Sequence, residues 1–384
     1  MTSSAPRSAS DDGALPAGKR VVVAAFGETP LDALEHHVSL ADMPAPDAAA
    51  LAPDEVLLSI KSCGVAWVDL LMMSGQYQHM ASPPYCPGME YSGVVVATGA
   101  AVDAARAAVG DAVFSDFILA GPRAGGRYQS SGGFASYAVL PAAAVRRVPA
   151  GFSFDEACNL LGNYETAWHC LIARGRLQAG ETVLITGASG ASGMAAVQVA
   201  KLLGATVIAT GRSDAKLAVV RAHGADHVIN TANADGTPGV RRFRDEVKAL
   251  TGGRGVDVVF DAVGGDTSLE CLRCVAFGAR FLIVGWTSTP FVARGRGQRG
   301  APNANQLPTN LIQMKGLSVL GSPAVISVAE NPAIRPPRVA QIMQWVAEGR
   351  IRPHISHAFP LVEFKRAMLA RWNGEVIGGC VLHP

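Results

Sequence analysis

The sequence predicts an α/β protein built from a β-rich N-terminal part and a doubly wound parallel sheet. Residues 19–150 contain short β-type runs broken by Gly and Pro, which is typical of an irregular, mostly antiparallel sheet. From residue 181 onward, β-type runs alternate with helix-type runs, and this alternation favours parallel strands joined by helices. The chain has 384 residues, more than one ordinary core accommodates, so we expect two domains.

Local patterns predict the elements of both parts. The β-type runs of the first part are 20–26, 55–63, 93–98, 112–114 and 135–140. In the second part the predicted strands are 181–186, 206–210, 227–230, 256–261, 280–284 and 317–320, and the predicted helices are 193–203, 214–222, 241–250, 267–276 and 339–347. Residues 358–384 return to short strands and one amphipathic helix.

These patterns divide the chain into a tail, a β-rich domain and a doubly wound domain. We expect a disordered tail over 1–18, a β-rich domain over 19–150 that is completed by 322–384, and the doubly wound domain over 151–321. A Gly-, Pro- and Arg-rich insertion spans 287–307 and is expected to be a lid or a solvated loop. For its Arg-rich segment 293–300, a solvated loop is favoured over contact with nucleic acid. The tail resembles no Arg-rich transit peptide, but a targeting role stays open.

Composition and charge point to small-molecule partners. Hydrophobic residues make up 49% of the chain and charged residues 17%, which suits buried parallel strands. The net charge of +2 implies no general attraction to nucleic acid or to an anionic membrane, and no apolar run reaches the roughly 20 residues of a membrane span.

The seven cysteines lack disulfide spacing, so a reducing, cytoplasmic location is expected. Cys271 and Cys274 form a C-x-x-C within a predicted helix, for which a structural role is favoured over a metal site.

A glycine-rich turn carries the clearest functional signal. A buried strand ends at Thr186, and the turn that follows contains Gly187, Ala188, Gly190, Ser192 and Gly193 before a helix begins. Glycines there let backbone N–H groups approach a pyrophosphate, and the N-terminus of the helix adds partial positive charge. The turn predicts a dinucleotide site.

The end of the second strand indicates which dinucleotide binds. An NAD-dependent site needs a carboxylate there for the ribose hydroxyls, whereas this chain has Gly211, Arg212 and Ser213. Asp214 is expected at the start of the next helix. Arg212 and Lys216 suit the 2′-phosphate of NADPH, which is the predicted cofactor; the alternative is that both are solvated surface charges.

Several blocks of the sequence resemble the medium-chain dehydrogenase/reductase superfamily, in its zinc-free quinone oxidoreductase (zeta-crystallin-like) branch. The blocks are 87–99, 176–187, 224–230, 251–265 and 349–356, in the family's order. The resemblance implies a GroES-like catalytic domain joined to a Rossmann NADPH-binding domain, an active site in the cleft between them, and a homodimer. It also implies that Trp286, after the fifth strand, lies where backbone groups reach the nicotinamide.

The resemblance also bears on metal and substrate. Zinc-dependent relatives carry Cys and His at the positions of Ala66 and Met89, and residues 90–127 contain no cysteine, so no metal is expected. Hydride must then go to an electrophilic acceptor, a quinone or an α,β-unsaturated carbonyl compound. Tyr77 and Tyr164 match aromatic cleft positions and are candidate hydrogen-bond donors, with packing as the alternative. Asn163 is a lesser candidate, since a helix cap explains it equally well.

Departures from the family keep two other functions open. Many relatives have Asn where this chain has Ala66, Tyr where it has Thr231, and Val where it has Ser192. One alternative is an enoyl-thioester reductase, whose basic patch would come from Arg123 and Arg127 or from the 294–299 segment. The other is a non-catalytic NADPH-binding protein.

Overall fold

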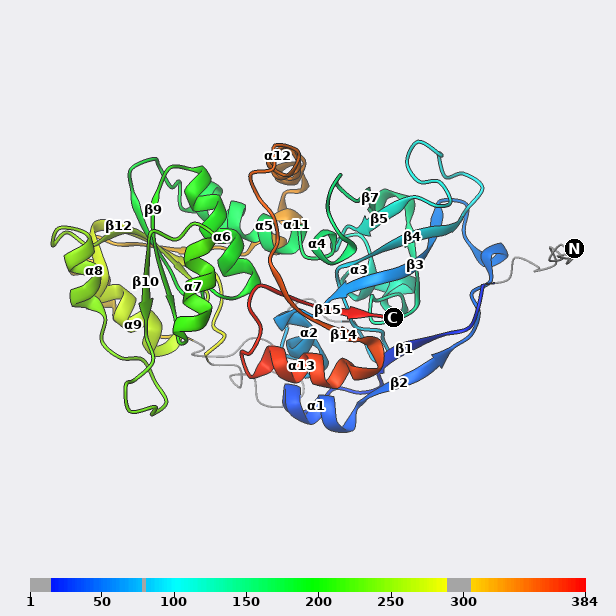
Figure 1. Ribbon diagram of the computed structural model, residues 1–384, viewed down its shortest axis with the longest axis horizontal. Coiled ribbons are helices and arrows are strands. Elements are labelled where there is room, and N and C mark those ends of the chain that lie inside the picture. Colours follow the sequence, from blue (N-terminus) through cyan, green and yellow to red (C-terminus); the bar gives the residue numbers. More distant parts are fainter. Residues whose placement is uncertain (1–14, 78–80, 289–304) are drawn as a thin grey trace, which may run out of the picture.

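The computed structural model describes residues 15–77, 81–288 and 305–384, and its ribbon has two lobes (Figure 1). Most of the predicted tail and of the predicted Arg-rich insertion therefore lies outside the described residues. Within those residues, no helix combines the length and the apolar composition needed to cross a bilayer.

One lobe contains a six-stranded parallel sheet with the order β10-β9-β8-β11-β12-β13. Its strands are β8 (Thr182–Ile185), β9 (Thr206–Gly211), β10 (His227–Asn230), β11 (Val256–Asp261), β12 (Val275–Ile283) and β13 (Ser318–Gly321). Counted along the chain, the order is 3-2-1-4-5-6, which confirms the doubly wound sheet. The winding reverses between β8 and β11, and ligands of such sheets bind at the carboxyl ends of the strands at that point.

Helices pack on both faces of this sheet (Figure 1). They are α6 (Ala191–Leu202), α7 (Asp214–Ala222), α8 (Arg244–Leu250), α9 (Gly265–Cys274) and α10 (Thr309–Met314). Strand β8 has Val183, Leu184 and Ile185 fully buried, as expected for a strand covered on both faces. Cys271 and Cys274 are both buried in α9.

Many element boundaries differ from those predicted, most of them by one or two residues. The helix predicted over 267–276 ends at Cys274 and β12 starts at Val275, because the β-branched Val275 is extended and Gly278 has φ +78°, which a helix cannot adopt. Helix α8 begins at Arg244 rather than at residue 241. Helix α12 (Arg335–Ala347) begins four residues before the predicted 339, because prolines are tolerated in the first turn of a helix.

The second lobe contains a mostly antiparallel sheet of seven strands. Its path is β14-β15-β3-β4-β5-β7, and β6 also pairs with β3. The strands are β3 (Glu55–Gly64), β4 (Tyr91–Thr98), β5 (Ala112–Ser115), β6 (Tyr137–Pro141), β7 (Val145–Arg147), β14 (Ile355–Pro360) and β15 (Gly379–His383). The C-terminal strands thus return to the lobe formed by the N-terminal part of the chain (Figure 1). An additional antiparallel pair, β1 (Gly18–Val23) and β2 (Val38–Met43), includes one strand that the sequence patterns did not predict.

Shorter helices surround this lobe and connect it to the parallel sheet. They are α1 (Pro30–His36), α2 (Trp67–Met73), α3 (Gly121–Ala124), α4 (Phe154–Ala157), α5 (Leu161–Trp168), α11 (Ala324–Glu330) and α13 (Phe364–Trp372), together with α12.

A buried ion cluster fixes α12 against both α5 and the end of β5. The Arg335 guanidinium donates to both carboxylate oxygens of Asp116, each at 2.8 Å, and to Glu165 at 2.8 to 3.2 Å. All three residues are buried. Buried charges are tolerated only with such partners, so the cluster holds these three elements in one arrangement.

Candidate active site

The predicted dinucleotide turn lies at the carboxyl end of β8, at the point where the winding of the sheet reverses. Gly187 has φ +59°, a conformation that favours glycine, and its carbonyl accepts from the Gly190 N–H at 2.9 Å. Gly190 then caps α6, whose twelve residues begin at Ala191. The free N–H groups of that first turn point out of the helix N-terminus, which is the arrangement that binds phosphate.

Gly193 permits the close approach of α6 to the turn. A Cβ at this position would lie 2.4 Å from the Gly187 carbonyl oxygen and 2.8 Å from the Ala188 Cα. Both are backbone atoms that cannot rotate away. Glycine at 193 is therefore a packing requirement of this turn.

A buried polar network joins β8 to β11 beside the turn. The Asp261 carboxylate, at 0% exposure, accepts from the Thr186 hydroxyl at 2.8 Å and from the Val263 and Gly264 N–H groups at 3.1 and 3.2 Å. The Ser268 hydroxyl also donates to it. This network fixes the two strand ends between which a dinucleotide would lie, and the sequence patterns gave no sign of it.

At the end of β9, basic residues lie where the 2′-phosphate prediction places them. Arg212 is exposed, and Ser213 precedes α7 as its N-cap. Asp214 is the first residue of α7 and accepts from the Asn230 amide at 2.9 Å. Lys216 donates to the Gly374 carbonyl in the connection between α13 and β15, and burial together with Arg212 lowers the pKa of Lys216.

Asn163 of α5 and Ser192 of α6 contact each other beside the glycine turn. The Ser192 hydroxyl donates to the Asn163 side-chain oxygen at 3.0 Å, and the Asn163 amide donates to the Asn159 carbonyl, also at 3.0 Å. Asn163 thus orients the glycine turn relative to α5. The structure thus gives Asn163 hydrogen bonds to Ser192 and Asn159, and its catalytic role stays a prediction.

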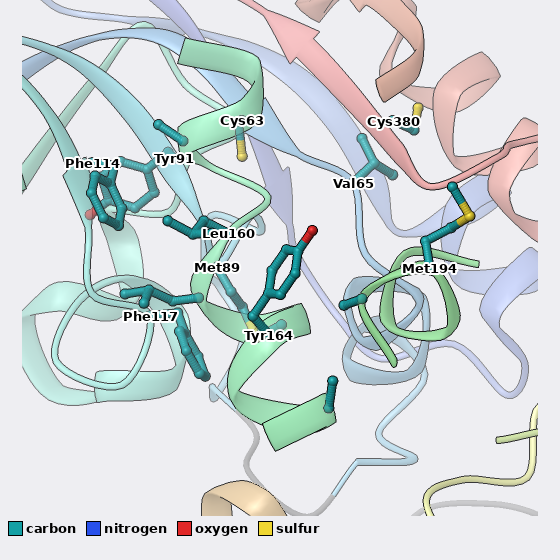
Figure 2. Close-up of a cluster of buried hydrophobic side chains, with 14 of the residues drawn as sticks. Cys63, Val65, Met89, Tyr91, Phe114, Phe117, Leu160, Tyr164, Met194 and Cys380 are labelled. Carbon is teal, nitrogen blue, oxygen red and sulfur yellow. The ribbon is translucent and has the colours of Figure 1, made fainter. Parts of the chain in front are cut away.

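Tyr164 is packed in the core with its hydroxyl occupied. The side chain is 2% exposed, and its hydroxyl donates to Gln198 of α6 at 2.7 Å. Figure 2 shows the ring among buried apolar side chains, between Leu160 and Met194. Burial raises the pKa of the phenol well above its usual value. These contacts favour the packing alternative.

Tyr77 is paired with a cation. Its hydroxyl accepts from the Arg123 guanidinium at 3.0 Å, and the Arg123 Cζ lies 5.7 Å from the centre of the Tyr77 ring. The sequence patterns placed Arg123 only in a surface patch. The hydrogen bond between Arg123 and Tyr77 joins residues 46 positions apart, so sequence spacing alone could not predict it.

Two acidic side chains lie close to this pair. Asp69 accepts from the Ala66 and Gly88 N–H groups, and burial raises the pKa of its carboxyl to about 6. Glu90 accepts from the Gly162 N–H at 2.8 Å, and burial raises the pKa of its carboxyl to about 7. Neither was a predicted site residue, although Glu90 stands in a block that carried the family resemblance.

Two family models match the chain. The alcohol dehydrogenase GroES-like domain matches residues 52–150, and the zinc-binding dehydrogenase model matches residues 191–332. A quinone oxidoreductase-like protein 2 from Bos taurus is 33% identical over 318 residues, which are 83% of this chain and 81% of that protein. The chain belongs to the medium-chain dehydrogenase/reductase superfamily.

Solved structures of this superfamily match the fold over nearly the full length. A probable oxidoreductase from Mycobacterium abscessus has a TM-score of 0.75 and 27% identity, covering 96% of this chain and 99% of that one. A quinone oxidoreductase from Pseudomonas syringae pv. Tomato has a TM-score of 0.73 and 25% identity, covering 96% and 100%. The predicted GroES-like and Rossmann domains and the quinone oxidoreductase branch are thereby confirmed.

Neither of the two positions compared with zinc ligands is Cys or His in this chain of the medium-chain dehydrogenase/reductase superfamily. Ala66 precedes α2 and offers no side-chain ligand, and Met89 is buried with 4% exposure. In the part of the chain that the structure describes, no group of three or more His, Cys, Asp and Glu side chains could hold a metal ion.

Trp286 lies after β12, close to the same edge of the Rossmann sheet. It is 43% exposed, and a Cβ at Gly264 would lie 3.0 Å from the Trp286 Cα. Its backbone therefore borders the loop that follows β11. Contact with the nicotinamide stays a prediction.

Proposed function

We propose that this protein is a zinc-independent, NADPH-dependent oxidoreductase that transfers hydride to quinones or α,β-unsaturated carbonyl compounds. The observation that carries the proposal is the glycine turn between β8 and α6, at the point where the winding of the sheet reverses. In the other lobe, Ala66 and Met89 occupy the positions of the zinc ligands of zinc-dependent relatives. The names of the relatives, quinone oxidoreductases among them, support the same class of acceptor.

The residues of the Rossmann lobe fit a dinucleotide phosphate. Added Cβ atoms at Gly190 and Gly193 would approach the Gly187 carbonyl oxygen, so glycine keeps this turn close to α6, which presents its N-terminus there. After β9, the first acid is Asp214, which is engaged with Asn230, whereas Arg212 and Lys216 supply positive charge. NADPH, when bound, supplies the hydride.

The protein's own contribution is to orient the acceptor and to stabilise charge. Without a Lewis acid, a preorganised donor must meet the oxygen on which negative charge develops. Tyr77, whose hydroxyl accepts from Arg123, is the candidate donor of this proposal, whereas the Tyr164 hydroxyl donates to Gln198. Asn163 and Ser192 would keep the cofactor turn in register with α5.

We also propose that the protein acts as a homodimer on small-molecule substrates. Strand β13 is an edge of the parallel sheet, and two apolar side chains near this edge are largely exposed, Phe277 at 85% and Met314 at 69%. Exposed apolar side chains next to an unpaired strand favour association.

Cofactor choice is tested by fluorescence titration with NADPH and NADH. We expect NADPH to bind more tightly, Arg212→Ala and Lys216→Ala each to weaken NADPH binding about 10-fold, and NADH binding to change less than about 2-fold. Arg221→Ala, at the far end of α7, is the matched control. Equal affinity of both nucleotides for the wild type would refute the NADPH assignment.

An acceptor screen then tests the reaction. Turnover of quinones or enones with NADPH supports the proposal, and metal chelation should leave it unchanged. Selective turnover of crotonyl-type thioesters would identify an enoyl-thioester reductase instead. Tight NADPH binding with no turnover would identify a non-catalytic NADPH-binding protein.

A further inference from the structure

Arg123 lies beside the positions that hold metal ligands in zinc-dependent relatives. It belongs to α3, which packs directly on the Gly88–Met89 backbone. A Cβ at Gly121 would lie 3.5 Å from the Gly88 carbonyl oxygen and 3.9 Å from that of Met89. Arg123 follows two residues later in the same helix.

Two aromatic rings hold the Arg123 guanidinium. Its Cζ lies 5.1 Å from the centre of the Phe117 ring and 5.7 Å from that of Tyr77. One of its Nη atoms donates to the Tyr77 hydroxyl, while the Nε–H is buried and has no hydrogen-bond partner. A guanidinium carries five N–H donors, so most of its binding capacity remains available.

Arg123 also has no counter-ion among the described residues. Every carboxylate oxygen of those residues lies more than 4.0 Å from its nitrogens. The contrast with Arg335 is informative, because Arg335 lies 5.6 Å from the same Phe117 ring but is neutralised by Asp116 and Glu165. A half-buried cation without an anion costs free energy that a bound anion would recover.

The two acidic side chains described above, Asp69 and Glu90, do not act as counter-ions of Arg123. The positive charge of Arg123 lowers the pKa of both Asp69 and Glu90, but each carboxylate already accepts from backbone N–H groups. Burial raises the pKa of both carboxyls, so they carry less negative charge near neutral pH than exposed acids do. These two carboxyls therefore leave the positive charge of Arg123 without a paired anion.

We propose that Arg123 binds the acceptor oxygen on which negative charge develops, with Tyr77 as its fixed partner. The inference rests on the proposed function and gives a guanidinium the task that zinc performs in metal-dependent relatives. As hydride forms the new C–H bond, the π electrons of the acceptor move to this oxygen, and an enolate results. For a quinone, loss of the proton from the same ring carbon and protonation of the second carbonyl oxygen then give the hydroquinone. The acceptor is thereby reduced, and the anion then takes a proton from water.

The kinetic test compares Arg123→Met and Arg123→Lys with Arg127→Met. Arg127 is exposed, is bonded to Glu55 at 2.9 Å, and lies four positions along the chain, which makes it a matched control. We expect Arg123→Met to lower kcat about 100-fold with a smaller change in KM, because the contact strengthens as charge develops. Arg123→Lys should retain part of the rate, and added guanidinium should partly restore Arg123→Ala. Wild-type kcat in Arg123→Met would overturn the inference while leaving the proposed function intact.

A binding test decides the matter without turnover. 4-Nitrophenolate resembles the anion of a reduced quinone, and its absorbance reports its ionisation. Wild type and Arg127→Met should bind it and lower its apparent pKa, whereas Arg123→Met should bind it at least about 10-fold more weakly. Equal affinity in all three proteins would overturn the role of Arg123 even if the wild type reduced no acceptor.

Discussion

Replacing Gly193 with alanine should separate α6 from the glycine turn and weaken cofactor binding. The added methyl would lie 2.4 Å from the Gly187 carbonyl oxygen, whereas ordinary contact begins at 3.4 Å. The helix must therefore move by about 1 Å, because backbone atoms on both sides block other adjustments. Overpacking of this kind costs about 1 to 3 kcal/mol of stability, and a shift of about 1 Å at a phosphate site should weaken NADPH binding at least about 10-fold.

Two further glycines make the prediction a graded series. A Cβ at Gly190 would meet the Gly187 oxygen at 3.3 Å, and one at Gly321 in β13 would meet nothing within 4 Å. Thermal unfolding and NADPH titration should rank Gly321→Ala nearest to wild type, Gly190→Ala next and Gly193→Ala lowest. If Gly193→Ala bound NADPH as Gly321→Ala does, the argument from close approach would be wrong.

Two other predictions concern pH and assembly. Since burial raises the folded-state pKa of Asp69 from 3.8 to about 6, its protonated form stabilises the fold, and about 3 kcal/mol should be lost as pH rises from about 4 through 6. Urea unfolding at pH 4.5 and 7.5 should show a smaller pH dependence for Asp69→Asn, and an unchanged one would contradict the assignment. In sedimentation velocity, the wild type should be a dimer that Phe277→Asp dissociates, whereas Val362→Asp, on a 61% exposed side chain of the other lobe, should not; a monomeric wild type would refute the proposal.

Elements of the Rossmann lobe were predictable where residues typical of turns and helix starts flank them. The bounds of β10, β11 and α7 agree with the predicted ranges 227–230, 256–261 and 214–222. In each case a short apolar or periodic run lies between glycine, serine or aspartate residues, which define turns and helix starts through their own backbone preferences. Where such residues are missing, as between α9 and β12, the predicted boundary differed from the observed one.

The candidate site was predictable only where its residues are neighbours in sequence. The glycine turn and the residues after β9 lie within short segments, so their chemistry was visible from spacing. The partners of Tyr164, Tyr77 and Lys216 lie 34, 46 and 158 positions away, respectively. Such contacts depend on how elements far apart in the sequence pack together, which no local pattern encodes.

The connection between α13 and β15 shows how far the cofactor site depends on this packing. Its Gly374 carbonyl accepts from Lys216, and its Gly378 N–H donates to the Ser189 carbonyl of the glycine turn at 2.8 Å. The same connection therefore contacts both the glycine turn and Lys216, which is predicted to bind at the ribose end of the cofactor. Gly378 has φ +64°, and a Cβ there would lie 2.2 Å from the His354 carbonyl oxygen, so its path is fixed by the catalytic lobe. Any ligand that displaces either contact must also change how the two lobes pack against each other.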